Sequence, residues 1–75
     1  MKQKTTDIVL AAYLKICGFT LETISVVGKQ GTFIFDDVEP EVVNQYFLGN
    51  AVVEPVTFNN TIRQLTTACK RMTNE

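Results

Sequence analysis

The sequence predicts a small α+β domain in the order helix, β-hairpin, short helix, long helix, with helices covering one face of a small single-layer sheet. Three observations predict this fold class. An apolar segment rich in helix formers ends at a glycine, a segment rich in strand formers surrounds the turn Gly-Lys-Gln-Gly, and Val-Glu-Pro occurs twice before helix-like patterns. The 75 residues form one domain, residues 1–75, in which we expect residues 1–4 and 73–75 to be flexible.

The first helix is expected over residues 6–17. Thr5 or Thr6 can cap its N-terminus, and Gly18 can end it in the left-handed conformation. The segment between them is apolar on nearly every side. We therefore expect the rest of the domain to cover this helix.

A β-hairpin is expected next, with strands near residues 20–27 and 32–36. Phe33 and Phe35 lie on the same face of the second strand, which should pack on the helices. Ile34 points to the other face and should be partly exposed. The hairpin leaves open strand edges, to which another chain can pair.

The repeated tripeptide is interpreted as two helix starts, at Val38-Glu39-Pro40 and Val53-Glu54-Pro55, because proline suits the first helical position. The first start precedes a short helix that ends near Gly49-Asn50. The connector 51–53 is apolar, and its three residues do not decide whether it forms a third strand along the hairpin. The second start precedes a long helix with a regular apolar stripe: Phe58, Ile62, Leu65, Cys69 and Met72.

The composition favours a protein that is not an enzyme. The chain has no His, so acid–base chemistry would be left to carboxylates, Lys or Tyr. Two cysteines without a histidine cannot complete a tetrahedral zinc site, and no phosphate-binding glycine loop is present. The cluster Asp36, Asp37, Glu39 and Glu41 lacks the spacing of a calcium loop. We expect no catalytic residue, metal, cofactor or small-molecule substrate.

The cysteines and the N-terminus indicate a cytoplasmic protein. Cys17 and Cys69 fall on apolar patterns, so we expect buried free thiols in a reducing compartment. The first apolar segment is broken by Lys15 and is shorter than the about 20 residues that cross a bilayer. It also lacks the cleavage site of a signal peptide. We expect no contact with membranes.

Charge is unevenly distributed, although the net charge is only −1. Residues 36–54 hold five acidic residues and no basic one. Within the same range, Tyr46, Phe47 and Leu48 are three consecutive bulky residues on the short helix, and they cannot all face one core. We therefore expect a protein–protein contact, with an unidentified partner or by self-association, through this segment. Its candidate residues are Asp37, Glu39, Glu41, Tyr46, Phe47 and Leu48.

A weak DNA- or RNA-binding module is the alternative. Arg63, Lys70 and Arg71 fall on one side of the long helix, and Lys29 lies at the hairpin tip. Lys2 and Lys4 in a loose N-terminal arm could add to this surface. The sequence pI of about 5.3 is against this hypothesis, since nucleic-acid-binding domains are usually basic.

Four segments resemble a family of small uncharacterised domains found in phages, prophages and bacteria. They are KTTDIVLAAYLKICGF, the hairpin ending in FIFDD, YFLGN, and VEPVTFNNTIRQL. The resemblance spans residues 5–69, and its most specific positions are helix caps and core residues. It implies a shared fold and a phage or prophage origin, with the host cytosol as location, and it carries over no catalytic residue.

Overall fold

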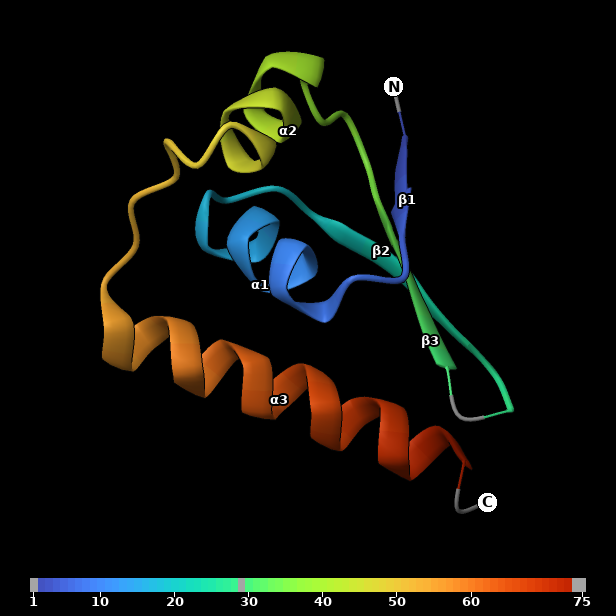
Figure 1. Cartoon of the computed structure of the whole chain (residues 1–75). Coiled ribbons are helices and arrows are strands. Elements are labelled where there is room, and N and C mark those ends of the chain that lie inside the picture. The colour runs from blue at the N-terminus through green and yellow to red at the C-terminus, as the bar shows by residue number, and fades with distance from the viewer. Residues whose placement is uncertain (1, 29, 74–75) are drawn as a thin grey trace.

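The chain follows the predicted order of elements. The structure, a computed structural model, describes residues 2–28 and 30–73. Within these residues it forms β1 (Gln3–Thr5), α1 (Ile8–Ile16), β2 (Leu21–Val27), β3 (Gln30–Phe35), α2 (Pro40–Phe47) and α3 (Pro55–Thr73). All three helices lie on one side of the sheet (Figure 1). The α+β fold class is therefore confirmed.

The sheet has one more strand than expected. Its order is β1-β3-β2, with both pairs antiparallel, so the second hairpin strand is the central one. We expected residues 1–4 to form a flexible arm, but residues 3–5 pair with β3, where Thr5 lies opposite Phe33. Lys2 forms an ion pair with Glu22 of β2, with 2.7 Å between Nζ and Oε1. The connector 51–53 is not a strand. Met1 and residues 74–75 lie outside the described residues.

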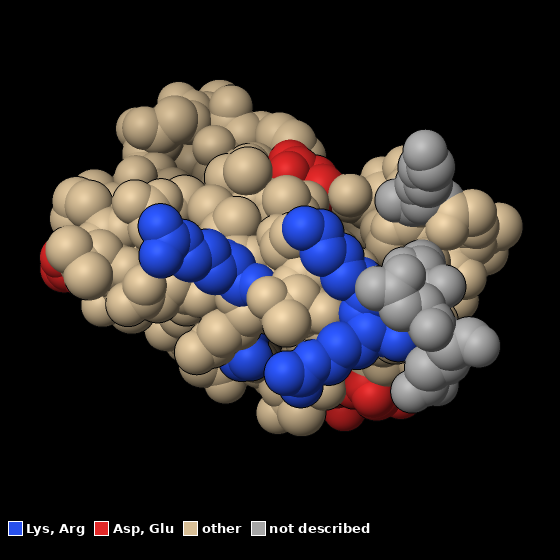
Figure 2. Space-filling model, turned by 90° about the horizontal axis from the view of Figure 1, so that it is seen from below, with Lys and Arg blue, Asp and Glu red and all other residues tan. Residues whose placement is uncertain are grey.

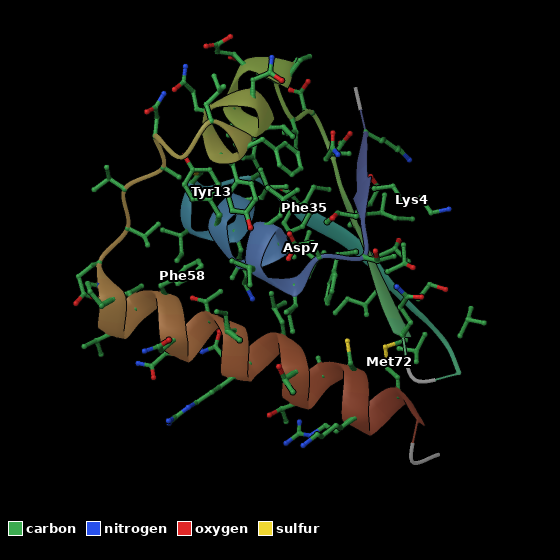
Figure 3. The ribbon with its side chains drawn as sticks, viewed as in Figure 1. Lys4, Asp7, Tyr13, Phe35, Phe58 and Met72 are labelled. Atoms are coloured by element: carbon green, nitrogen blue, oxygen red, sulfur yellow. The ribbon has the colours of Figure 1, made fainter. Side chains whose placement is uncertain are left out.

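The core lies between the sheet and the helices. Phe33 and Phe35 are fully buried, as predicted for the face that packs on the helices. Phe35 points toward the helices, whereas Lys4 points away from them on the open face (Figure 3). Ile34 is partly exposed, also as predicted. The remaining buried apolar residues come mostly from α1: Leu10, Ala11, Ala12, Leu14, Val38 and Leu65. The all-round apolar helix is thus covered, because it packs against both α3 and the sheet.

Asp7, rather than a threonine, caps α1. Its Oδ1 accepts hydrogen bonds from the backbone N–H groups of Val9 and Leu10, at 2.9 and 3.4 Å. Thr5 supports the cap, because its Oγ1 accepts a hydrogen bond from the backbone N–H of Asp7. At the other end Gly18 has a φ of +97°, so the predicted left-handed stop is confirmed.

Both Val-Glu-Pro tripeptides begin helices, as predicted, with Pro40 and Pro55 as the first helical residues. The two glutamates behave differently. Glu54 accepts hydrogen bonds from the backbone N–H groups of Val56 and Thr57, at 3.1 and 2.6 Å. Glu39 makes no side-chain cap hydrogen bond. Both copies of the repeat therefore begin a helix at the proline, but only the second copy also caps its helix with the glutamate side chain.

The prediction of two buried thiols is wrong. Cys17 is exposed and Cys69 is partly buried, and both are free. Cys17 continues the spacing of Leu10 and Leu14, but it stands at the C-cap, where α1 ends. Cys69 lies against β3 at Gly31, where a Cβ would come within 2.6 Å of its Sγ. No helix in the described part of the chain is long and apolar enough to cross a membrane.

Candidate functional site

Tyr46, Phe47 and Leu48, the three bulky residues at the end of α2, point in different directions, as helical geometry requires. Phe47 and Leu48 are 69% and 71% exposed, while Tyr46 packs against the core. The prediction that at least one of the three lies at the surface is therefore confirmed. Phe47 is held by an edge-on contact with the ring of Tyr46, with 5.3 Å between the ring centroids.

Tyr46 fixes α2 to α1. Its hydroxyl donates a hydrogen bond to Oδ2 of Asp7 at 3.3 Å, and its ring lies 5.7 Å from that of Tyr13, centroid to centroid. Burial, followed by the negative charge of Asp7, raises the pKa of Tyr46 above its ordinary value. The sequence groups Tyr46 with Phe47 and Leu48 as a candidate contact residue. In the structure Tyr46 instead links α2 to α1 and lies beneath the two exposed residues.

The acidic candidates lie at the start of the same helix. Asp37, Glu39 and Glu41 are all exposed, and Asp37 has a φ of +56°, which an aspartate tolerates better than most residues. Glu41 precedes Leu48 by seven residues, about two helical turns, so the two share one face of α2. The structure therefore brings the acidic and apolar candidates to the same end of the molecule.

A chain of hydrogen bonds connects α2 to the segment that follows it. The Gln45 amide donates to Oε1 of Glu41 at 2.8 Å, and the Asn50 amide donates to Oε1 of Gln45 at 3.0 Å. Gly49 ends the helix with a φ of +79°. These contacts hold the start of the connector between α2 and α3 against the helix.

Two more exposed apolar residues lie beyond α2, Val52 and Val56, and the sequence did not indicate them. Val52 on the connector is 89% exposed and Val56 in the first turn of α3 is 65% exposed. Phe47, Leu48, Val52 and Val56 are called the apolar strip below. Val56 was recognisable, since it precedes Phe58 of the core stripe by two residues, about 200° around the helix. No sequence pattern indicated that Val52 is exposed, because its exposure depends on the path of the connector between α2 and α3.

The basic candidates lie along α3. Arg63, Lys70 and Arg71 are exposed, and Lys and Arg side chains gather on the face seen from below in Figure 2. Lys29 lies outside the described residues. A hollow of about 410 Å³ on this helix is bordered by both arginines. Acidic and basic candidates therefore lie apart, near α2 and on α3, with α1 between these helices (Figure 1).

A larger cavity of about 650 Å³ lies where α3 meets the hairpin, and the sequence did not indicate it. Phe33, Val26 and Ile8 form its apolar wall, Gly31 and Cys69 lie where the helix meets the strand, and Thr66 and Lys70 are among its polar lining. Its existence depends on how α3 crosses the sheet. Within the described residues, no three His, Cys, Asp or Glu side chains form a group that could hold a metal ion.

Comparison with known proteins places the chain in a family but gives no activity. The model of the family described as "Domain of unknown function (DUF5659)" matches residues 2–70. Searches among curated proteins and among solved structures found no significant match. The match covers β1 through most of α3, and hence the whole core. The chain belongs to the DUF5659 family of domains of unknown function.

Proposed function

We propose that the protein is a non-catalytic interaction module that binds a protein partner through the apolar strip and the acidic residues beside it. The observation that carries the proposal is the exposure of the strip, 65–89% for its four large side chains. Such side chains on a small domain are typical of contact surfaces when they occur together. Here they follow one stretch of chain, from Phe47 to Val56, along the outside of the molecule (Figure 1).

The charges beside the strip indicate what the partner should carry. Glu39 is the N-cap residue of α2, Glu41 lies in the first turn of that helix, and Glu54 stands at the far end of the connector. Their carboxylates would attract a partner that surrounds an apolar patch with Lys or Arg side chains. The proposed contact is therefore apolar at its centre and acidic at its rim, which is the usual anatomy of a protein interface.

The proposal includes an origin and a location. A phage or prophage origin is supported by the sequence resemblance, and a reducing cytoplasm is supported by the two free thiols, Cys17 and Cys69. A non-catalytic role is supported by the lack of any histidine in the chain. Transcription after prophage induction and fractionation of the producing cells test the origin and the location.

Affinity co-purification from cells that naturally produce the protein tests the function. The double variant Phe47→Ser/Leu48→Ser should lose a partner that the wild type retains. Val27→Ser is the matched control, because Val27 is 78% exposed but lies at the end of β2, away from the strip. If the double variant keeps every partner of the wild type, or Val27→Ser loses the same one, the strip is not the contact surface.

A further inference from the structure

Within the described residues, the outward side of α3 carries basic side chains and no acidic one. Between Pro55 and Thr73 the only charged residues are Arg63, Lys70 and Arg71, and all three are exposed. Among the described residues, neither arginine forms an ion pair. This face is therefore more basic than the net charge of the chain suggests.

A hollow between the two arginines has a lining suited to anions. Its described walls are Arg63, Gln64, Thr67 and Arg71, and among the described lining residues only Ala68 is apolar. The described side chains of the lining offer guanidinium, amide and hydroxyl groups and no carboxylate. These residues lie on the side of α3 opposite the face that the helix buries, so packing in the core does not hide them.

We propose that this face of α3 binds the phosphate backbone of a nucleic acid, with Arg63 and Arg71 each contacting a phosphate. The guanidinium fork pairs with phosphate through two parallel hydrogen bonds. The two arginines are eight residues apart, about 12 Å along the helix axis. That distance equals the rise of about three to four nucleotides of a duplex strand, so the arginines contact non-adjacent phosphates. Gln64 and Thr67, between them, suit phosphate or sugar contacts.

Two other anionic partners fit the surface less well. A helix that lies on an anionic membrane needs a free apolar face, but Ile62 and Leu65 of α3 are occupied in the core. A protein interface needs a buried apolar or aromatic anchor, and this face offers only Ala68. The acidic residues near α2 lie away from this face and orient the domain with α3 toward the polyanion.

Fluorescence anisotropy of the full chain with labelled single-stranded DNA, single-stranded RNA and duplex DNA tests the proposal. With the two arginines on phosphates, the logarithm of the binding constant should fall with the logarithm of salt at a slope of about −1.8 for duplex and about −1.4 for single strands. Between 50 and 200 mM salt, duplex affinity should then fall about 12-fold. The nucleic acid that binds best identifies the preferred form.

The variant Arg63→Gln/Arg71→Gln should bring the duplex slope close to zero and weaken binding at low salt at least about tenfold. Lys2→Gln/Lys4→Gln is the charge-matched control, because it also removes two positive charges, one just before β1 and one within it. Its slope should equal that of the wild type. Circular dichroism of each variant verifies the fold. The proposal is overturned if no probe binds at 25 mM salt, if the arginine variant keeps the wild-type slope, or if the control loses as much.

Discussion

The hydroxyl of Tyr46 donates a hydrogen bond to the carboxylate of Asp7, 39 residues away, and this contact joins α2 to the N-terminal cap of α1. The carboxylate of Asp7 thus caps the N-terminus of α1 and also anchors α2. The 3.3 Å separation and the exposure of Asp7 indicate a hydrogen bond of modest strength. Beside it, the packing of Tyr46 on Tyr13 places Phe47 and Leu48 at the surface.

Tyr46→Phe removes this hydrogen bond and retains the ring. We expect the free energy of unfolding in urea to fall by about 0.5–1 kcal/mol, the usual net contribution of such a bond. Tyr46→Ala should lower it further, because the contact with Tyr13 is also lost. Equal effects of the two variants would show that the ring does not contribute to the attachment of α2.

Alkaline pH should weaken the fold through the same residue. The pKa of Tyr46 is raised in the folded protein, so its contribution is complete below the unfolded pKa of about 10 and is lost as the pH rises through the folded pKa. The pKa of Tyr13 is raised too, mainly by the side chain of Cys17. Part of the loss of stability at alkaline pH should therefore persist in Tyr46→Phe. Thermal melts from pH 8 to 11 should show a smaller alkaline loss for Tyr46→Phe than for the wild type. Parallel curves would contradict this linkage.

The two Val-Glu-Pro glutamates provide a matched pair. Glu54→Ala should lower the melting temperature at pH 7, because two backbone N–H groups of α3 lose their acceptor. Glu39→Ala should leave it nearly unchanged, since Glu39 makes no such hydrogen bond. Similar losses from both substitutions would mean that charge near the helix start, rather than capping, is responsible.

The same pair predicts a dependence on acid pH. Hydrogen bonds from Thr57, then from Val56, lower the pKa of Glu54 below its ordinary value. Its contribution is therefore present above the unfolded pKa and is lost as the pH falls through the folded pKa. The gap in melting temperature between wild type and Glu54→Ala should narrow as the pH falls below about 4. A gap that is constant down to pH 2 would exclude this linkage.

Gly31 and Cys69 should show strong coupling in a double-mutant cycle. A Cβ at Gly31 would lie 2.6 Å from the sulfur of Cys69 but 3.8 Å from its Cβ. Gly31→Ala should therefore lower the free energy of unfolding by about 1–2 kcal/mol, near the low end for overpacking because the thiol can rotate. Adding Cys69→Ala should remove most of that loss, as measured by urea unfolding. Additive effects would mean that the close approach of α3 to β3 is not the reason for a glycine here.

Local signals were sufficient for most of the fold. The prolines at 40 and 55 marked helix starts, Gly18 marked a stop, and the alternation around Phe33 and Phe35 gave the buried face of β3. Residues 3–5 could not be identified as a strand, because they are polar and their conformation comes only from pairing with β3. These residues form a strand only because they pair with β3, and no local sequence pattern indicates that pairing.

The candidate surfaces were predictable to different degrees. Phe47 and Leu48 followed from the impossibility of burying three consecutive bulky residues on one helix face. Val52 could not be found, because the exposure of a connector depends on the placement of its two helices. The cavity beside Cys69 depends on the crossing of α3 over the sheet, which no spacing in the sequence encodes.

The most direct test of the central claim, that the apolar strip contacts a protein, is site-specific photo-cross-linking in the producing cells. A photoreactive amino acid in place of Leu48 should give a discrete higher-mass adduct, and Glu39→Lys/Glu41→Lys should reduce it by weakening the attraction for a basic partner. The same group in place of Thr23, exposed on β2, is the control and should give none. No adduct at position 48, or equal adducts at both positions, would contradict the account.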